Sequence, residues 1–482
     1  MYRSILSNAW LVAAACLLAA GCKEEGQPRQ RLVSEAEMDA LKQDIQKTVE
    51  RNRSRKCPRA VLRGEPLDGP AADDILAVVE GAADTRACLN ELKEHNDLLD
   101  EAHSYPRGQV PTGFPYRLNR TAKPQPEAPE QLLALERACE PIVQRIQKAT
   151  RHPDACSPFL PGLRGQPSLI SAVRAMRVAS VKARRLVAKG ETEQGFELLL
   201  DVVRFSQDLC RGGASLLETM VAATGVASAL AVLEHSLNRP EPIDAARLAQ
   251  IDDELAALIV THVHPAEYLR GEVEAMSIEY LADDRRARGK QGEHPALKTA
   301  GVDVRDDIAL SHMAMHELGE EVLSGCKPSD PPIRCTGHIR KLAARYAENK
   351  EDHETVKTLL KSALSKDKTI PIRRRIIDIL KSMAAPAHDR YLVRDGQIRF
   401  QLAALRLHAA YRRLAESSKT CPELAAFDAP PLSERRTDPY SGEAVRIEQL
   451  GPGKFVLRSP VPLGKQGGEN AEPAMFIDCP YR

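Results

Sequence analysis

The sequence predicts a mainly α-helical protein: an antiparallel body of helical hairpins, followed by a small C-terminal α+β module with a β-hairpin. Apolar residues recur at helical spacing through most of the chain. Aromatic residues, which sheets favour, make up only 4% of it. Strand-like alternation is confined to residues 445–477. These three observations together favour helix-on-helix packing with one short sheet.

The first 21 residues predict a signal peptide rather than part of the fold. Arg3 supplies a positive charge, Ala9–Ala20 form an almost wholly apolar run, and small residues precede Cys22. The end of this segment, Leu-Leu-Ala-Ala-Gly-Cys22, resembles the lipobox of bacterial lipoproteins, in which the cysteine is lipidated and becomes the mature N-terminus. The lipobox usually has Leu where this chain has Ala19, and Ala19 and Gly21 also suit an ordinary signal peptidase.

The lipobox resemblance implies a chain held on a membrane by the lipid on Cys22, with residues 22–33 as a polar tether. Lys23 follows the cysteine, which by the enterobacterial sorting pattern implies the outer membrane of a bacterial cell envelope, facing the periplasm or the cell surface. Soluble secretion and an uncleaved anchor are the alternatives. We expect no cofactor apart from this lipid.

The charge balance excludes one large class of partner. The chain has 68 basic and 67 acidic residues, and Arg3 is the only charged residue of the signal segment, so the mature body is neutral. A nucleic-acid binder needs a basic surplus on one face, and we therefore expect no nucleic-acid partner. Few aromatic residues also argue against stacking platforms for single strands.

The helical pattern begins at Ser34-Glu-Ala-Glu37, which predicts a capping box and a helix to about Arg53. Glycines at 190 and 212–213 punctuate the clearest helices, which implies antiparallel neighbours. Further helices are expected over residues 70–99 with a break near Gly81, and over 128–150, 168–189, 191–211, 214–237, 242–262, 265–284, 304–323, 334–347, 351–364, 370–383 and 388–417.

Three parts of the mature chain are expected from this pattern. Residues 34–285 form a helical body interrupted by a long Pro- and Gly-rich loop over 104–130. A glycine-containing basic loop near 286–298 separates it from a helical continuation over 300–385. Residues 386–482 form the long helix and hairpin module.

Nine cysteines follow Cys22, and an exported chain is expected to join most of them as disulfides. A bridge between Cys326 and Cys335 closes ten residues of a proline-rich loop and contributes about 2.7 kcal/mol through chain entropy. The other bridges are assigned to cysteines that follow one another in the sequence: Cys57–Cys88, Cys139–Cys156 and Cys421–Cys479.

The cysteine left over in this assignment is Cys210, which lies within an amphipathic helix. We expect it to be a free, buried thiol that packs as a small apolar residue. No C-x₂-C pair occurs in the chain, so a metal cluster is not favoured.

The most visible candidate for chemistry is His312-Met-Ala-Met-His316 on a predicted helix. Histidines four residues apart share a helix face and can reach one metal ion. The order His-Glu-x-x-His of zinc proteases is absent, and two ordinary helix histidines are the competing interpretation. His262 and His264, at a helix boundary, are expected to be structural.

One glycine-rich segment resembles a phosphate-binding loop. Arg211-Gly-Gly-Ala-Ser215 follows a helix rather than a strand, so a helix–Gly–Gly–helix turn explains it. The nucleophile elbow, the Walker loop and the dinucleotide fingerprint are absent from the sequence.

The last part of the chain resembles a tail of uncharacterised bacterial envelope proteins and, distantly, of type II secretion pseudopilins. The motifs are Asp438-Pro-Tyr-Ser-Gly442 after a long helix, Phe455-Val-Leu-Arg-Ser459 in a hairpin, and Gly467-Gly468. The resemblance implies a small α+β packing module. The segment Leu463–Glu469 lacks the aspartates that would bind calcium, so calcium does not carry over.

These observations favour an envelope-tethered lipoprotein that acts as a non-enzymatic scaffold or protein-interaction module with a protein partner. Helical hairpins build grooves that take peptides or partner helices. The first alternative is a periplasmic metal- or small-ligand-binding protein that uses His312 and His316. The second is an enzyme of unrecognised class with dispersed catalytic residues.

Overall fold

The computed structural model describes residues 34–95, 130–161, 169–275, 278, 313, 316–348, 369–462 and 474–481. In this part the protein is mainly helical with one small antiparallel sheet, which confirms the predicted fold class. The predicted signal peptide, the tether, residues 104–129 of the long loop, the basic loop 286–298 and the helix 351–364 lie outside the described residues.

Most predicted helices are present with small shifts of their ends. Helix α2 begins after Ser34, whose side chain and that of Glu37 form the predicted capping box. The helices are α2 (Glu35–Arg53), α3 (Ala72–Leu76), the π-turn η1 (Ala77–Gly81), α4 (Arg86–Glu94), α6 (Glu130–Ala138), α7 (Glu140–Ala149), α8 (Leu169–Ala188), α9 (Thr192–Asp208), α10 (Leu216–Leu237), α11 (Ala245–Val260), α15 (Pro332–Glu348) and α17 (Thr369–Ser418). Unlabelled helical segments cover residues 265–275 and 316–324.

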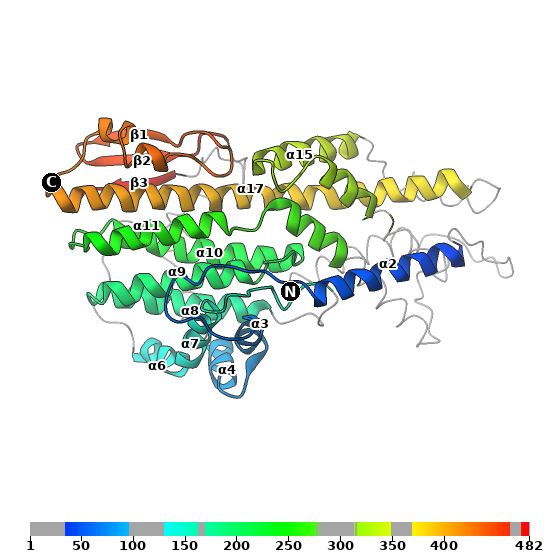
Figure 1. Cartoon of the computed structure of the whole chain (residues 1–482), viewed down its shortest axis with the longest axis horizontal. Helices are drawn as coiled ribbons and strands as arrows, with labels where there is room; N and C mark the ends of the chain where they lie inside the picture. Colours follow the sequence, from blue (N-terminus) through cyan, green and yellow to red (C-terminus); the bar gives the residue numbers. More distant parts are fainter. Residues whose placement is uncertain are drawn as a thin grey trace.

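Helices α8 to α11 form the predicted stack of antiparallel hairpins (Figure 1). Gly190, with a φ of +88°, follows the end of α8, and Gly213, with a φ of +98°, lies in the turn between α9 and α10; this conformation favours glycine. Helix α10 packs against α8, α9 and α17 at the centre of the stack. Length and composition alone would let α10 cross a membrane, yet 67% of its most apolar window is buried inside the protein, as in a core helix.

Two predicted helix boundaries are wrong. Residues 128–150 form two helices, because the chain leaves helical geometry at Cys139, two residues before Pro141 in the first turn of α7. Conversely, the two helices expected over 370–383 and 388–417 are one helix of 50 residues, α17, although Pro386 lies between them. Packing against α10, α11 and α15 outweighs the hydrogen bond that proline removes. The expected module boundary at 385/386 therefore falls inside a helix.

The predicted hairpin and third strand form a sheet beside α17 in the order β1 (Arg446–Gly451), β2 (Lys454–Arg458), β3 (Ala474–Asp478). The pairing places Ile447 opposite Leu457 and Phe455 opposite Ile477. Phe455 packs with Tyr411 of α17 and with Phe427. These side chains belong to the same hydrophobic cluster as the helical body, so the tail and the body share one core.

Side chains of helix α10 and of Asn238 directly after it form hydrogen bonds with the free edge of β3. The backbone N–H of Phe476 donates to Glu234, and the Asn238 amide donates to the carbonyl of Phe476 and accepts from the N–H of Asp478. Unpaired edge groups are a template for aggregation, and side chains from α10 remove that template along β3.

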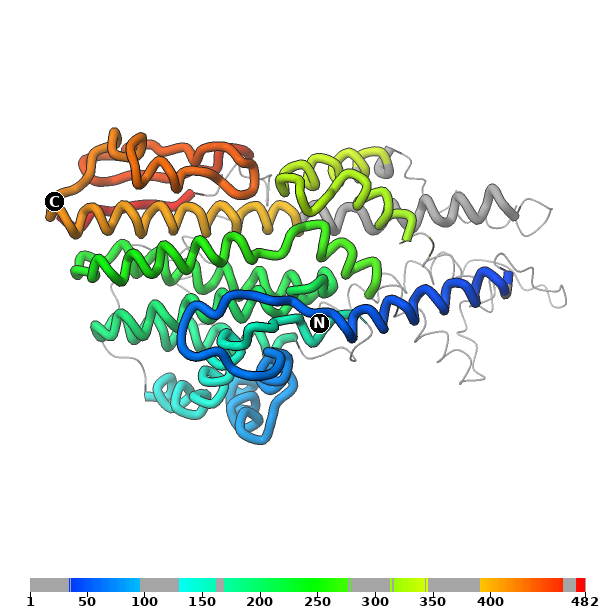
Figure 2. The backbone as a smooth tube through the Cα atoms, viewed as in Figure 1, coloured from blue at the N-terminus to red at the C-terminus, as the bar shows by residue number. Residues whose placement is uncertain are grey.

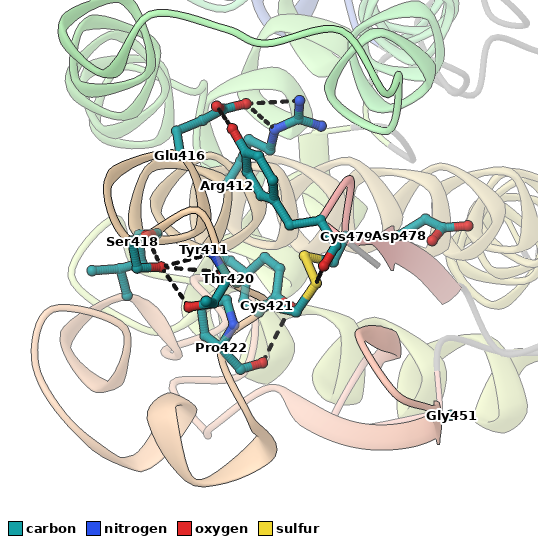
Figure 3. Close-up of a disulfide and its surroundings, with 12 residues drawn as sticks. Tyr411, Arg412, Glu416, Ser418, Thr420, Cys421, Pro422, Gly451, Asp478 and Cys479 are labelled. Atoms are coloured by element: carbon teal, nitrogen blue, oxygen red, sulfur yellow. Dashed lines mark hydrogen bonds and ion pairs between the residues drawn. A yellow bond between two sulfur atoms is a disulfide. The ribbon is translucent and has the colours of Figure 1, made fainter.

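The C-terminal end of α17 is held by Arg412, whose side chain is only 1% exposed (Figure 3). Its guanidinium donates to Glu416 and to three backbone carbonyls, those of Leu237, Arg239 and Glu241, at 2.6–3.1 Å. These carbonyls belong to the end of α10 and the turn that follows it. One side chain therefore satisfies backbone groups of an element about 170 residues away in sequence.

Glu416 extends this network to two further segments. Its carboxylate accepts from the N–H of Ile243 and from the hydroxyl of Tyr481, next to the Cys421–Cys479 bridge. Burial alone would raise the pKa of Glu416, but the hydrogen bonds from Tyr481 and Arg412 outweigh it and hold that pKa below its ordinary value. The carboxylate is therefore charged at neutral pH and completes the ion pair.

Replacement of Arg412 by Met is expected to destabilise the fold by about 3–5 kcal/mol, because it removes the buried cation that pairs with Glu416 and leaves three backbone carbonyls without their donor. Denaturant unfolding measures this loss. The side chain of the neighbouring Arg413 takes no part in this network, so Arg413→Met is the matched control and should change stability by less than about 0.5 kcal/mol. Equal losses in the two variants would refute the assigned role of Arg412.

Candidate functional site

The structure does not test the predicted metal pair. His316 is exposed at the start of the helical segment 316–324, and His312 lies outside the described residues. A site that uses both histidines therefore stays a prediction.

All eight cysteines predicted to pair are in disulfides, and Cys210 is free and buried as expected. The Cys326–Cys335 and Cys421–Cys479 bridges match the prediction. The first four cysteines after Cys22 do not pair in sequential order as predicted: the bridges are Cys57–Cys156 and Cys88–Cys139.

The correct pairing follows from which segments lie side by side. Cys88 is on α4, which packs against α6, and Cys139 directly follows α6. Cys57 lies beside residues 154–156, where its N–H donates to Asp154 and its carbonyl accepts from Ala155. The resulting bridges are nested, a pattern that sequence order alone cannot reveal.

One set of potential metal ligands lies beside the third bridge. Ligand atoms of His264, Cys326 and Cys335 lie within 4.8 Å of one another. Both sulfurs are in the disulfide, and the two ring nitrogens of His264 contact the Asp330 carbonyl and the Ala266 N–H. His264 thus fixes the disulfide loop to the preceding helix boundary, and the expectation that it is structural is confirmed.

His262 lies in a buried polar cluster between three helices. Its Nε2 contacts the Asp395 carboxylate at 2.8 Å, and its Nδ1 contacts the amide nitrogen of Gln207 at 3.1 Å. The other oxygen of Asp395 accepts from Arg399 at 2.7 Å, and Arg399 also donates to the Val263 carbonyl. The cluster joins α9, the end of α11 and α17.

The charges in this cluster follow from burial and pairing. Burial is the main reason that the pKa of His262 lies below its ordinary value, so the ring is neutral at pH 7. Burial would raise the pKa of Asp395, but Arg399 and His262 outweigh it and lower that pKa. A neutral His262 therefore donates from Nε2 to an ionised Asp395 and accepts at Nδ1 from Gln207.

A His–Asp pair of this kind occurs in nucleophilic hydrolases, where the second ring nitrogen faces a hydroxyl or thiol. Here that nitrogen faces the amide of Gln207, which is not a nucleophile. The Asp395 side chain is completely buried and that of His262 is 10% exposed. This arrangement supports packing between helices and offers no group for acyl transfer.

A second group of charged residues, which the sequence analysis missed, lies along one face of α9. We call it the buried charge cluster: Arg59, Arg63, Asp201, Arg204, Asp208, Arg211 and Glu254. Residues 201, 204 and 208 follow one another at intervals of three and four, which places them on one side of α9, and Arg211 lies in the turn directly after it. That spacing within an otherwise apolar helix is the signal that could have revealed the cluster.

The chain between α2 and α3 covers this face of α9. Figure 2 shows the segment passing across the stack, and we call residues 54–71 the covering segment. It contributes Arg59, which donates to Asp208 and to the His152 and Ala149 carbonyls. It also contributes Arg63, which pairs with Asp201 of α9 at 2.7 Å and with Glu254 of α11 at 3.3 Å.

Burial shifts the ionisation of this cluster strongly. It raises the pKa of Asp201 to about 6 against the pull of Arg63, and it raises the pKa of Glu254. Burial, with repulsion from Arg59, lowers the pKa of Arg204 to about 10. Arg204 therefore remains a cation at neutral pH, whereas Asp201 titrates at about pH 6.

The glycine-rich turn before α10 is not a phosphate cradle. A Cβ atom on Gly271 would lie 2.0 Å from the Gly213 carbonyl oxygen, so the helix over residues 265–275 is packed directly on this turn. The expected helix–Gly–Gly–helix turn is confirmed, and the space that a phosphate would need is filled by backbone.

Comparison of the chain with protein-family models, with curated proteins and with solved structures finds no match.

Cys210 is expected to resist alkylation in the native state. Burial raises its pKa to about 12, so the reactive thiolate is nearly absent at neutral pH. Iodoacetamide should modify Cys210 only after unfolding in denaturant without reductant, as intact-mass and peptide mass spectrometry will measure. Modification of this residue in the folded protein would show that the thiol is accessible.

Replacement of Asp201 by Asn is expected to flatten part of the pH dependence of stability. A pKa raised in the folded state stabilises the fold fully below the unfolded value and loses that contribution as pH rises through the folded value. Between about pH 4 and 7 the wild type should thus lose up to about 3 kcal/mol relative to Asp201→Asn. Urea unfolding across this range measures the difference.

The control for this experiment is Asp253→Asn, because Asp253 is exposed on α11. Its stability curve should run parallel to that of the wild type. An Asp201→Asn curve that is also parallel to the wild type would contradict the raised pKa.

Proposed function

We propose that this chain is a bacterial envelope lipoprotein, tethered through lipid on Cys22, that acts as a non-enzymatic scaffold or protein-interaction module. The observation that carries the proposal is that the reactive side chains are buried or engaged in hydrogen bonds. In the described part of the chain, His262 and His264 have both ring nitrogens engaged, and Cys210 is a buried thiol. These groups hold helices together and are not poised for chemistry.

The disulfides support the export part of the proposal. Four bridges join eight of the nine cysteines that follow Cys22. Such bridges form and persist in oxidising compartments, as the periplasm and the outer surface are. A lipid-bearing cysteine followed by a polar tether would keep this rigid body close to a membrane while leaving its faces open to a partner.

Large apolar side chains on the surface are the positions at which a protein partner is expected to make contact. Val260 at the end of α11 is 84% exposed, and Leu450 on β1 is 52% exposed. Strand β1 is at the edge of the sheet, where an extended chain can add. Single exposed apolar residues are ordinary, so these positions serve as probes and not as a defined interface.

Replacement of Cys22 by Ala is expected to abolish lipidation and release the protein from the membrane fraction of its native host. Fractionation and intact-mass spectrometry measure both effects. Cys16→Ala is the matched control, since Cys16 belongs to the removed signal segment, and should behave as the wild type. Two results together would overturn the lipoprotein assignment. The Cys22→Ala variant would stay in the membrane fraction, and the mass of the wild-type protein would show no acyl chain.

The scaffold role is tested separately by a photo-crosslinking residue at Val260 or Leu450 in the native envelope. We expect one or more defined protein adducts from an exposed position and none from a matched probe at the buried Leu230. Failure to form adducts at either exposed position, together with the absence of a partner in chemical cross-linking of native envelopes, would contradict a scaffold role.

A further inference from the structure

The ring of His264 lies directly beside the Cys326–Cys335 bridge. One ring nitrogen and the two sulfurs all lie within 4.8 Å of one another. The ligand atoms around a tetrahedral Zn²⁺ ion are roughly 3.4–3.8 Å apart, because the bonds to nitrogen and sulfur are about 2.0–2.3 Å long. Small movements would therefore bring this nitrogen and both sulfurs to bonding distance of one ion once the bridge is open.

A fourth side chain of a type that zinc prefers lies one helical turn beyond Cys335. His338 follows Cys335 by three residues on α15, so the two share a helix face. The His338 ring also packs on Gly325, next to Cys326, since a Cβ atom added to Gly325 would collide with that ring. Two cysteines and two histidines are a ligand set typical of structural zinc sites.

Both histidines have the hydrogen bond that usually accompanies metal binding. Nε2 of His264 contacts the Asp330 carbonyl at 3.0 Å, and Nε2 of His338 contacts the Glu321 carbonyl at 2.7 Å. A carbonyl only accepts, so in the neutral ring Nε2 carries the proton and Nδ1 keeps its lone pair. Metal-binding histidines donate their second N–H in this way.

The Nδ1 atom of His264 can exchange its present contact for a metal ion. It accepts from the Ala266 N–H at 3.2 Å, which is at the long end of the range for such bonds. Burial is the main reason that the pKa of His264 lies below its ordinary value, so the ring is neutral at pH 7 and keeps the lone pair that a metal ion needs.

The surroundings of the bridge favour a metal–thiolate site. Both cysteines are buried in the second hydrophobic cluster, together with Leu318, Val322 and Ile339. An apolar shell keeps water away from the sulfurs and strengthens the attraction between thiolates and a cation. The two histidines are only half-buried, so an ion can approach from their side.

We propose that the bridge and a zinc site are alternative states of this loop, and that after reduction Cys326, Cys335, His264 and His338 bind one Zn²⁺ ion. A dithiol donor supplies the reduction. Its two sulfurs become joined, while two electrons and two protons pass to Cys326 and Cys335, whose S–S bond breaks. Binding of Zn²⁺ to the two sulfurs then releases these two protons.

Either state would hold the loop 326–335 together, by a covalent bond in oxidising surroundings and by the metal ion in reducing ones. The ion would in addition join the loop to His264 at the boundary that follows α11. The proposal rests neither on the scaffold role nor on the lipid anchor.

Titration of the purified protein with Co²⁺, after reduction by a water-soluble phosphine, tests the site. In this reduction the phosphorus takes up oxygen from water and the two sulfurs become thiols. We expect one equivalent of Co²⁺ to give thiolate-to-cobalt charge-transfer bands and strong tetrahedral d–d bands, which Zn²⁺ removes by displacement. The oxidised protein should show none of these bands. Their absence from the reduced protein would overturn the proposal.

His264→Ala and His338→Ala should each weaken Co²⁺ binding about tenfold or more. His95→Ala is the control, because His95 is exposed at the end of α4, and it should bind as the wild type does. The double variant Cys326→Ser/Cys335→Ser should lose the bands, although the other three bridges supply six thiols when reduced. Unchanged bands in this variant, or unchanged affinity in either histidine variant, would overturn the ligand set.

Alkylation of the reduced wild type gives a readout that needs no variant to fold. Zn²⁺ added before N-ethylmaleimide should slow the modification of Cys326 and Cys335 about tenfold or more relative to a chelator, because a metal-bound thiolate is protected. Cys57 and Cys156, compared by peptide mass spectrometry, should react equally with and without Zn²⁺. Equal protection of both pairs, or protection of neither, would contradict the site.

Discussion

The fold depends on one buried guanidinium, that of Arg412, which joins the long helix α17 to the end of α10 and, through Glu416, to the C-terminal tail. A buried arginine is tolerable only when its donors are satisfied. Here carbonyls that α10 and its following turn leave without helical partners supply the acceptors. The same contact gives the carbonyls at the end of α10 a donor and gives the buried guanidinium its acceptors, so neither is left unsatisfied.

This constraint explains why the tail is not an independent module. Helix α17 contacts α10 and α11 along the body and β3 of the sheet, while side chains of α10 close the edge of β3. Apolar residues from Ala71 to Cys479 form one hydrophobic cluster. A second, smaller cluster surrounds the Cys326–Cys335 bridge between α15 and α17. The body, the sheet and α15 therefore share α17 as a common support.

Local signals predicted much of this fold. The capping box at Ser34, the glycine at 190 and the alternation around Gly453 each depend on a few neighbouring residues, and each is confirmed. What failed depended on distant partners: the pairing of Cys57, the continuity of α17 through Pro386, and the role of Arg412. A single sequence shows the period of a helix, but it does not show which segment will cover its polar face.

We expect the tail and the helical body to unfold as one cooperative unit around α17. Native-state hydrogen exchange followed by mass spectrometry tests it most directly, since it reports the opening free energy of each segment. Amides of β2 and of the C-terminal half of α17 should therefore exchange with the same denaturant dependence as those of α10. Exchange of β2 through a separate, lower-energy opening, while α10 stays protected, would contradict it.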